Sequence, residues 1–555
     1  MTPAELQVAV GDLVRSAAAR RGADLTLSDA DLLLERPRSR EHGDWASTVA
    51  MRVGKRIGVP PRDLAQQLAT DLGALPGVAA VAVAGPGFIN ITLEAASAGA
   101  LAARIVQEGE AFGRSEMLAG RSVNMEFVSA NPTGPLHLAH TRWAALGDAI
   151  SRVLRASGAE VVDEYYINDA GSQMDHFGAS VLAAARGLPT PEGGYPGEYI
   201  SDLAKALLAE DPEVLDLADA AALALARDFG YKRQLEEIKR SLADFNVHFD
   251  VWFSERSLHD DSDGPSAIEV AVERLRAQGR VFEADGALWL RTSEFGDDKD
   301  RVLIRGNGET TYFAADAAYY LDKRDRGYDE KVYLLGADHH GYIGRLKALA
   351  GAAGDDPDSV TVLIGQTVKV NGARLSKRAG NIVELVDLLD WLGSDSLRYW
   401  LARYPADTPL DLDGEQLRRR TNDNPVFYVQ YAHARTRSVA RNAVIAEVTR
   451  QHDGGDAFDP ALLTHPTESD LLGELEQFPR TVERAATLRE PHRVARYLEQ
   501  LAGAYHRWYD NCRVIPVAGE PVEDVHRTRL VLNEAVGQVL RNGLDLLGVT
   551  APERM

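Results

Sequence analysis

The sequence predicts an α/β protein built on a doubly wound parallel sheet, with a small α+β unit before it and an all-helical unit after it. Residues 122–167 have the pattern of a buried strand, a tight loop, a helix and a second strand, which is how such a sheet begins. Short apolar strands return between residues 287 and 370. Strand patterns stop at about residue 410, and amphipathic helices follow.

These patterns divide the chain into three predicted domains. Residues 1–115 combine an amphipathic helix with two strands that are separated by a Gly-Pro-Gly turn at residues 85–87. Residues 116–410 hold the parallel sheet, and mostly helical material at about 175–300 is predicted to be inserted between the two halves of that sheet. Residues 411–555 are predicted to form a helical bundle.

The composition of this 555-residue chain excludes several classes of protein. A formal net charge of −22 argues against a non-specific nucleic-acid coat, which is usually basic. The single cysteine, Cys512, excludes an intrachain disulfide and a multi-cysteine zinc site. No apolar run reaches the roughly 18–20 residues that span a bilayer, and the first residues lack the basic and apolar regions of a signal peptide. We therefore expect a cytoplasmic protein without a membrane partner.

A basic island occupies residues 36–62 of this acidic chain. Seven arginine and lysine residues lie there against only Glu41 and Asp44. Local charge rather than net charge decides whether a surface attracts RNA. Two interpretations stay open, namely an ordinary solvated helix face and an RNA contact. The candidates for that contact are Arg52, Lys55 and Arg56.

A candidate phosphate site lies where the first helix of the sheet domain begins. His137 and His140 are three residues apart, so they fall on nearly one face of a helical turn. Backbone N–H groups at a helix N-terminus favour an anion, and imidazoles add further donors. Such a site suits the triphosphate of ATP, although two histidines at this spacing also fit a zinc site or a satisfied core pair.

A second candidate phosphate site is the basic loop within residues 367–381. An Asn-Gly pair between apolar runs is a strong hairpin signal and opens the loop. A lysine that loop closure brings to a phosphate stabilises the charge that develops there during transfer. An ordinary basic turn is the alternative. The polar residues concerned are Arg374, Ser376, Lys377 and Arg378.

Both segments resemble the signature sequences of class I aminoacyl-tRNA synthetases, and in particular those of arginyl-tRNA synthetases. The string EFVSANPTGPLHLAHTRWAALGD at residues 126–148 is similar to the extended first signature, and Arg-Leu-Ser-Lys-Arg at 374–378 is similar to the second. One departure is Ala139, which stands where the family has a glycine against the adenine ring. The resemblance implies a Rossmann-like catalytic domain in which His137, His140 and Lys377 are catalytic. It implies ATP contacts from His137, Ala139, His140, Asp338, Ser376, Lys377 and Arg378.

Carboxylates in the same region point to a substrate with a guanidinium group. The guanidinium carries a fork of donors that fits two carboxylate oxygens at once. Tyr312 and Asp316 are four residues apart on a predicted helix, and Glu255 follows a strand-like run. Each of these residues alone is more often a surface or capping residue. Together they resemble the arginine-binding set of the family, which implies contacts from Glu126, Asn131, His137, Glu255, Tyr312, Asp316 and His339.

The resemblance covers essentially the whole chain. The segments EHGDWAS and GPGFINI look like parts of the appended N-terminal domain of arginyl enzymes, which contacts the tRNA elbow. This resemblance favours RNA contact as the interpretation of the basic island. The helical third after residue 410 resembles the anticodon-binding bundle of the family. There Tyr428, Tyr431 and Trp508 are candidates to stack on bases, although bundle aromatics are by default core residues. YINDAGSQ, at residues 165–172 and onward, is also typical of the family.

The resemblance implies the ligation of L-arginine to tRNA(Arg), with arginyl-adenylate formed from ATP as the intermediate. We expect Mg²⁺ to accompany ATP without a dedicated metal site in the protein, and we expect a monomer. Two alternatives stay open: a class I synthetase for another amino acid, and a non-catalytic tRNA-binding paralogue. The acidic residues argue against a glutamine or glutamate enzyme, and a paralogue would be expected to lose His140 or Lys377.

Overall fold

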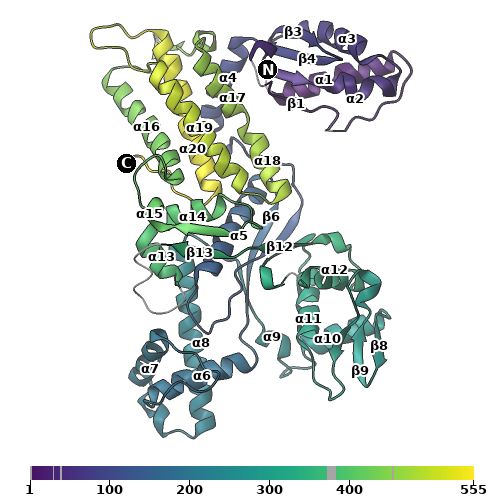
Figure 1. Cartoon of the computed structure of the whole chain (residues 1–555), viewed down its shortest axis with the longest axis vertical. Coiled ribbons are helices and arrows are strands. Elements are labelled where there is room, and N and C mark those ends of the chain that lie inside the picture. The colour runs from purple at the N-terminus through teal and green to yellow at the C-terminus, as the bar shows by residue number, and fades with distance from the viewer. Residues whose placement is uncertain (1–2, 29, 38–39, 340, 372–382, 453–454) are drawn as a thin grey trace.

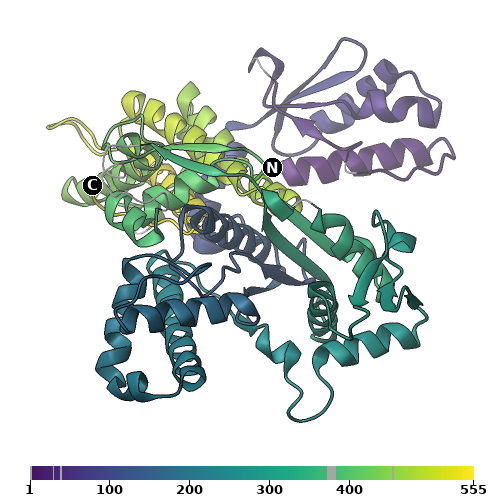
Figure 2. The same cartoon turned by 60° about the horizontal axis from the view of Figure 1, so that its bottom comes forward.

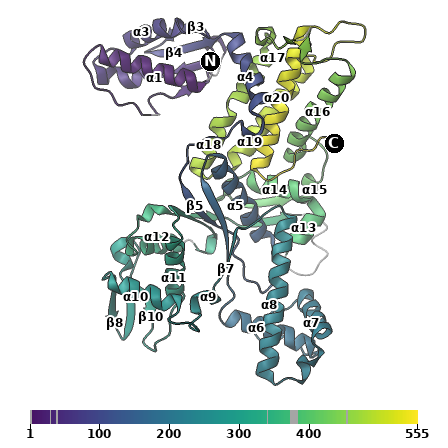
Figure 3. The same ribbon diagram turned by 180° about the vertical axis from the view of Figure 1, so that it is seen from behind.

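The computed structural model describes residues 3–555, apart from residues 29, 38–39, 340, 372–382 and 453–454. It consists of an N-terminal unit, a central parallel sheet with two inserted lobes, and a C-terminal helical bundle (Figure 1). The two lobes lie away from the N-terminal unit in all three views (Figures 1, 2 and 3). Within the described part of the chain, no helix is long and apolar enough to cross a membrane.

The central sheet has the strand order β12-β11-β5-β6-β7, and every pairing in it is parallel. This arrangement confirms the predicted doubly wound sheet. From β5 the chain first builds outward through β6 and β7, and it later adds β11 and β12 on the other side of β5. The carboxyl ends of β5 and β11 therefore flank the crevice where sheets of this kind bind ligands. The strands are β5 (Ser122–Glu126), β6 (Glu160–Ile167), β7 (Val251–Ser254), β11 (Glu330–Gly336) and β12 (Val360–Gly365).

Two lobes are inserted in the sequence of the sheet domain, one before β7 and one after it. The first lobe consists of helices packed around a core of their own, which includes Phe177 and Val181. The second lobe contains a three-stranded antiparallel sheet with order β10-β9-β8. The stretch at about 175–300, which we expected to be one helical insertion, therefore contains a strand of the parallel sheet. The first lobe is formed by α6 (Ser172–Ala185), α7 (Glu198–Glu210) and α8 (Asp219–Asp244). The second begins with α9 (Arg256–His259), α10 (Ala267–Ala277), β8 (Val281–Ala284), β9 (Ala287–Leu290) and β10 (Arg301–Ile304).

Two further helices complete the second half of the sheet. They are α11 (Tyr312–Asp325), which precedes β11, and α12 (Tyr342–Ala352), which connects β11 to β12. Helix α11 begins at an N-cap where the Thr311 side chain accepts a hydrogen bond from the backbone N–H of Ala314. Its buried face carries small and aromatic residues that pack with β11 and α12. Helix α11 therefore lies directly beneath the ligand-binding edge of β11.

The C-terminal bundle shares one hydrophobic core with the sheet, as we expect where long amphipathic helices cover a layer of strands. Its largest fully buried side chains include Tyr399, Tyr505 and Trp508. The connecting elements are β13 (Val368–Asn371), α13 (Leu385–Leu392), α14 (Ser394–Ala402), β14 (Leu410–Asp413) and α15 (Gly414–Leu417). The bundle elements are α16 (Pro425–Ile445), β15 (Gln451–His452), β16 (Gly455–Asp456), α17 (Pro466–Glu476), α18 (Phe478–Leu488), α19 (His492–Asn511) and α20 (Asp524–Leu546).

The N-terminal unit is an antiparallel sheet of order β1-β2-β4-β3 covered by helices, with a separate hydrophobic core. Arg36 joins it to the bundle, because its guanidinium lies 3.1 Å from Glu476 of α17. Its elements are α1 (Pro3–Ala19), β1 (Leu34–Glu35), β2 (Trp45–Ser47), α2 (Val49–Val53), α3 (Pro61–Gly73), β3 (Val78–Ala84) and β4 (Phe88–Leu93). The next helix, α4 (Ala95–Glu108), packs against α17 and α20 instead of this sheet.

A buried arginine connects the sheet domain to the bundle. Arg398 of α14 is fully buried and donates hydrogen bonds to the carbonyl oxygens of Leu547, at 3.1 Å, and Phe245, at 2.9 Å. It also donates to Asn246 and pairs with Asp148. Asp148 lies on α5 (Leu138–Ala156), the helix between β5 and β6. One guanidinium thus holds together α5, the return from the first lobe and the end of α20.

Replacing Arg398 by methionine is expected to destabilise the protein by about 3 kcal/mol or more, because three carbonyls lose their buried donor and Asp148 keeps Arg152 as its remaining cation. Arg437→Met is the matched control, since Arg437 pairs with Glu553 at the surface and both side chains are more than a third exposed. That change should cost at most about 1 kcal/mol. Urea unfolding of the full-length variants measures both effects, and equal shifts in midpoint would contradict the role of Arg398.

Candidate active site

The loop after β5 is held in a strained conformation at the ligand-binding edge of the sheet. Val128 and Ser129 have φ values of 67° and 43°, which non-glycine residues seldom adopt. The Ser129 hydroxyl accepts a hydrogen bond from the backbone N–H of Tyr166 at 3.1 Å. The Tyr165 hydroxyl donates to the carbonyl of Ala130 at 2.9 Å. Strand β6 therefore fixes this loop, and strain of this kind is common at binding sites.

The two predicted histidines lie at the start of α5. Their ring centroids are 3.8 Å apart, and the backbone N–H of His137 donates to Nδ1 of His140 at 3.4 Å. Since Nδ1 of His140 accepts, the neutral ring carries its proton on Nε2. Burial lowers the pKa of His137, and burial together with His137 lowers the pKa of His140 to about 3. The helix N-terminus therefore presents neutral imidazoles and backbone N–H groups, which is a suitable environment for an anion.

Backbone pairing brings the residues just after the second predicted motif beside the first motif. The N–H of Leu138 donates to Val383 at 3.0 Å, and the N–H of Leu385 donates to Leu136 at 2.7 Å. Residues 372–382 lie outside the described residues, and Ser376, Lys377 and Arg378 lie among them. Because the chain leaves this segment directly at Val383, the segment ends next to His137.

A buried arginine on α5 holds the chain just before β13, the strand that precedes residue 372. Arg142 donates to the carbonyl oxygens of Gln366, at 2.8 Å, and Pro405, at 2.9 Å. Gln366 lies two residues before β13, the strand that leads into the segment. Burial lowers the pKa of Arg142 to about 10, which leaves it charged at neutral pH. Arg142 is part of the first signature sequence, and in the structure it positions α5.

The sequence GADHHG, which contains Asp338 and His339, begins at Gly336, the last residue of β11. Residues Ala337–His339 form the short helix η6, and the His339 ring lies 5.4 Å from Tyr342. The side chain of Asp338 lies outside the described part of the chain. Glu126 and Tyr333 are paired in register on the neighbouring strands β5 and β11. The motif therefore lies at the same edge of the sheet as the histidine helix.

Two buried carboxyl groups form an acidic pocket beside this edge. Asp316 is on α11 and Glu255 follows β7. Burial, together with the charges of Glu255 and Glu126, raises the pKa of Asp316 to about 7. Burial and the charge of Asp169 raise the pKa of Glu255 to about 7. A bound cation would stabilise the charged forms of both groups, so the pocket suits a guanidinium.

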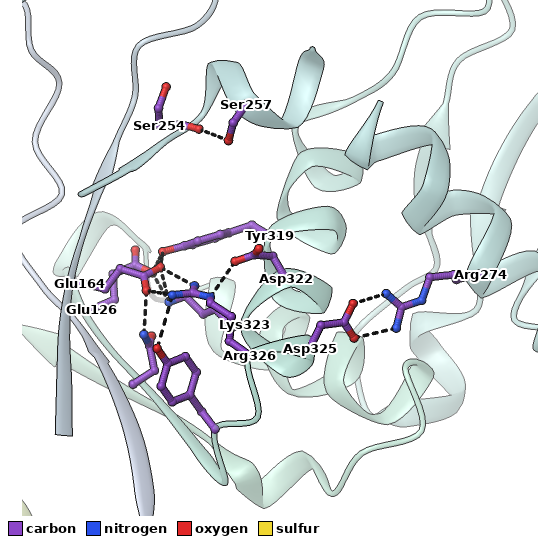
Figure 4. Close-up of polar contacts among 12 residues, drawn as sticks. Glu126, Glu164, Ser254, Ser257, Arg274, Tyr319, Asp322, Lys323, Asp325 and Arg326 are labelled. Atoms are coloured by element: carbon purple, nitrogen blue, oxygen red, sulfur yellow. Dashed lines mark hydrogen bonds and ion pairs between the residues drawn. The ribbon is translucent and has the colours of Figure 1, made fainter. Parts of the chain in front are cut away.

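Glu126 differs from these two carboxyl groups because the protein already supplies its cation. Lys323 of α11 is fully buried, and its Nζ lies 2.5 Å from Glu126 (Figure 4). The Tyr319 hydroxyl donates to Glu126 at 2.9 Å, and Arg326 forms a bidentate pair with Glu164 at 2.6 and 2.9 Å. Sequence reasoning missed this network. Its signal was the spacing of residues 316, 319 and 323, which lie on one face of α11.

The remaining predicted arginine contacts are more open. Tyr312 lies one turn before Asp316, and 77% of its side chain is exposed. The Asn131 side chain donates to Gln173 at 2.6 Å. Burial raises the pKa of Tyr166, and the charges of Glu255, Asp316, Glu126 and Asp169 raise it further. The structure thus gathers the three acidic candidates and leaves Tyr312 at the rim.

The predicted RNA-contacting residues divide into exposed and buried groups. Arg52, Lys55 and Arg56 are exposed on α2 and the turn after it, and Arg56 pairs with Asp31 at 2.8 Å. Trp508 is fully buried in the bundle core. The prediction that its ring stacks on RNA is therefore wrong, because its amphipathic helix turns that face inward.

An aromatic and basic cluster on the bundle surface contains the other two aromatic candidates. Tyr431 is stacked on Phe427 with ring centroids 5.8 Å apart, and Tyr428 lies 5.0 Å from the His506 ring. The guanidinium of Arg435 lies 4.7 Å from the ring of Tyr431. Partly exposed rings next to a guanidinium are a surface on which unstacked bases bind.

Comparisons with known proteins agree with this geometry. Family models match residues 5–93 (arginyl tRNA synthetase N terminal domain), 226–398 (tRNA synthetases class I (R), catalytic domain) and 429–555 (DALR anticodon binding domain). Arginine–tRNA ligases of Pseudarthrobacter chlorophenolicus and Renibacterium salmoninarum are 61% and 62% identical to this chain, over 100% of each chain. The arginyl-tRNA synthetase structure of Thermus thermophilus has a TM-score of 0.76 at 24% identity, over 100% of both chains, and shares the fold.

The parallel sheet, the histidine-bearing helix start and the matching catalytic model define a class I aminoacyl-tRNA synthetase, an enzyme that uses ATP. With relatives above 60% identity over the full length, the chain belongs to the arginine–tRNA ligase family. The two alternatives that the sequence left open, a synthetase for another amino acid and a non-catalytic paralogue, are therefore set aside.

Proposed function

We propose that the chain charges tRNA(Arg) in two steps at the edge where β5 and β11 end. The carboxylate of L-arginine attacks the α-phosphorus of ATP, which forms arginyl-adenylate and releases pyrophosphate. A hydroxyl of the terminal adenosine of tRNA(Arg) then attacks the activated carbonyl and releases AMP. The observation that carries this proposal is the acidic pair Asp316 and Glu255, which lies close to Glu126, the last residue of β5, since the charges of Glu255 and Glu126 both raise the pKa of Asp316.

Neutral donors and a basic segment act on the phosphates. His137 and His140 donate from their rings, and the N-terminus of α5 adds backbone N–H groups. Ala139 lies in the same first turn, on the side that we assign to adenine. Ser376, Lys377 and Arg378 belong to the segment that ends beside His137, and we assign Lys377 to the charge that develops on the phosphate. Positioning and electrostatic stabilisation account for such a step without a covalent enzyme intermediate.

Magnesium would accompany ATP as a phosphate-bound ion. Within the described residues, no group of three histidine, cysteine, aspartate or glutamate side chains could hold a metal ion. Mg²⁺ often keeps several waters and binds mainly through substrate phosphates, so such an arrangement suits this site. The ion would supply charge neutralisation at the phosphates, while the protein supplies the donors around them.

The arginine side of the site is acidic. We assign the guanidinium to Asp316 and Glu255, with Tyr312 beside them on α11. The α-amino group lies toward Glu126 and Asn131, and His339 approaches from the end of β11. We assign the adenosine ribose to Asp338 in the same motif. Placing one charged substrate group at each end of the pocket would align the carboxylate with ATP.

The tRNA would lie across three domains, for which we propose the boundaries 1–115, 116–410 and 411–555. The basic island meets the elbow through Arg52, Lys55 and Arg56, and the bundle meets the anticodon loop through Tyr428 and Tyr431. A monomer is sufficient for this arrangement, because one chain carries every domain. A substrate tRNA places the enzyme in the cytoplasm.

Charge reversal of Arg52 and Lys55 together is expected to raise the KM for tRNA and to reduce the slope of log affinity against log salt by about 1.5–2, because two phosphate contacts are lost. Arg56 is left intact because it pairs with Asp31 and its removal would disturb the fold. Arg276→Glu with Arg305→Glu, on the second lobe, is the charge-matched control. An unchanged tRNA affinity and salt slope would show that the island is a solvated face.

Asp316→Asn is expected to lower kcat/KM for arginine at least about tenfold, since the guanidinium loses a buried charged partner. The kcat/KM for citrulline, whose side chain is neutral at that end, should fall much less. The ratio of kcat/KM for arginine to that for citrulline should therefore decrease. ATP–pyrophosphate exchange with tRNA present measures both substrates. Asp325→Asn on the same helix, where Asp325 pairs with the partly exposed Arg274, is the control. An intact arginine preference in Asp316→Asn would place the pocket elsewhere.

Arginine binding is expected to weaken as the pH falls through about 7. The pKa values of Asp316 and Glu255 are raised to about 7 in the free protein, and a guanidinium binds their ionised forms. Binding therefore releases protons, and the affinity is greatest above both pKa values. The KM for arginine should rise about tenfold to a hundredfold between pH 8 and pH 6, according to whether one or both groups must ionise. The KM for ATP serves as the control, and a flat arginine KM would rule out these two groups.

A further inference from the structure

The segment between β6 and α6 is the conspicuous sequence feature to which the proposed reaction gives no role. Within it, Asp169 lies just after the end of β6 and lines a cavity of about 440 Å³, yet it is only 2% exposed. Its Oδ2 accepts a hydrogen bond from the Ser254 hydroxyl at 2.6 Å, and its Oδ1 accepts from the backbone N–H of Arg256 at 3.1 Å. Its carbonyl oxygen accepts from Nε of Arg256 at 2.7 Å. A single buried aspartate therefore accepts hydrogen bonds from Ser254 and Arg256, which are separated in sequence by one residue.

The residue between those two is Glu255. Its own N–H donates to the carbonyl of Ile167, the last residue of β6, at 3.1 Å. Its φ and ψ values of −58° and −32° show that the backbone has already turned out of β7. The peptide groups on both sides of Glu255 are thus tied to the end of β6 and to Asp169, and these ties determine where its side chain points.

We propose that Asp169 is a positioning residue that aims Glu255 at the guanidinium of arginine without touching the substrate itself. This inference rests on the proposed function, in which Glu255 binds that guanidinium. Both oxygens of Asp169 are occupied by Ser254 and Arg256, so the aspartate acts through Glu255. Outer partners that orient a binding group in this way change substrate affinity more than they change stability.

The charge of Asp169 has a second effect on the same group. It adds to burial in raising the pKa of Glu255 to about 7. The substitution Asp169→Asn keeps the shape of the side chain but removes this charge, so the pKa of Glu255 should fall. The charged and titratable groups around Glu255 and Asp169 are Tyr166 of β6, Tyr231 of α8, Arg256 and His259 of α9, and Asp316 of α11.

The test uses the full-length enzyme in ATP–pyrophosphate exchange with tRNA present. The variants are Asp169→Asn, Glu255→Gln and the double variant. At pH 8.5, where Glu255 is ionised, Asp169→Asn is expected to raise the KM for arginine about tenfold, because Glu255 is no longer aligned with the guanidinium. The kcat and the KM for ATP should change less than about twofold. The double variant should be no worse than Glu255→Gln alone, since contacts that act through one residue are not additive.

A pH profile separates positioning from a merely structural role. In Asp169→Asn, the pH below which the arginine KM rises should move downward, because the pKa of Glu255 falls. Asp175→Asn is the matched control, since Asp175 lines the same cavity but forms an exposed pair with Arg227 at 3.1 Å. It should leave the KM and the profile unchanged. Ser254→Ala, which removes one donor to Asp169, should raise the KM in the same way but less, and it keeps the test decisive if Asp169→Asn folds poorly.

The outcomes distinguish the inference from the function on which it rests. If Glu255→Gln leaves the arginine KM unchanged, the proposed pocket is wrong, and the role of Asp169 is overturned with it. If Glu255→Gln raises the KM but Asp169→Asn does not, the pocket stands and the positioning role is overturned. Additive effects in the double variant, or an unshifted pH profile, would also overturn the positioning role.

Discussion

The guanidinium of Arg398 is the contact on which the relative placement of the site and the bundle depends. Through Asp148 it holds α5, the helix whose first turn carries His137 and His140. Through the carbonyl of Leu547 it holds the end of the bundle. Space for it exists because residue 548 is glycine, where a Cβ would lie 2.1 Å from a guanidinium nitrogen. The start of α5 and the end of the bundle are therefore both tied to one charged group that water does not reach.

The buried charges around the site divide into two kinds. Glu126 and Glu164 have cations supplied by the protein, Lys323 and Arg326. At Asp316, burial and the like charges of Glu255 and Glu126 raise the pKa, and the charge of Arg345 opposes them. Buried ionised groups that the fold does not compensate are costly, so they are kept where a ligand compensates them. This difference separates the carboxylates that the fold pairs with its own cations from Asp316, which we assign to the guanidinium of the substrate.

Local patterns were enough to predict a doubly wound parallel sheet and the helix that begins at the two histidines. The spacing of Tyr312 and Asp316 also predicted correctly that they share a helix. Residues four apart lie next to each other on the surface of a helix. The pairing of Lys323 with Glu126 was out of reach, since it joins residues 197 positions apart and depends on how α11 lies under β5. The strand-like run before Glu255 was recognised, but its place as β7 in the parallel sheet was not, because a four-residue pattern does not show which sheet a strand joins. Trp508 was misassigned because amphipathic helices place aromatic residues on either face, and only packing decides which.

Helix α4 has a consequence for how the molecule can be divided. It follows the N-terminal sheet in sequence but packs against α17 and α20, and Phe112 just after it lies 6.1 Å from Phe478. Because sheet and bundle also share one core, a cut near residue 410 would expose apolar surface on both fragments. A cut near residue 94 would separate a unit with its own core from the rest. The N-terminal unit is thus a separable block, whereas the catalytic sheet and the bundle depend on each other for their apolar core.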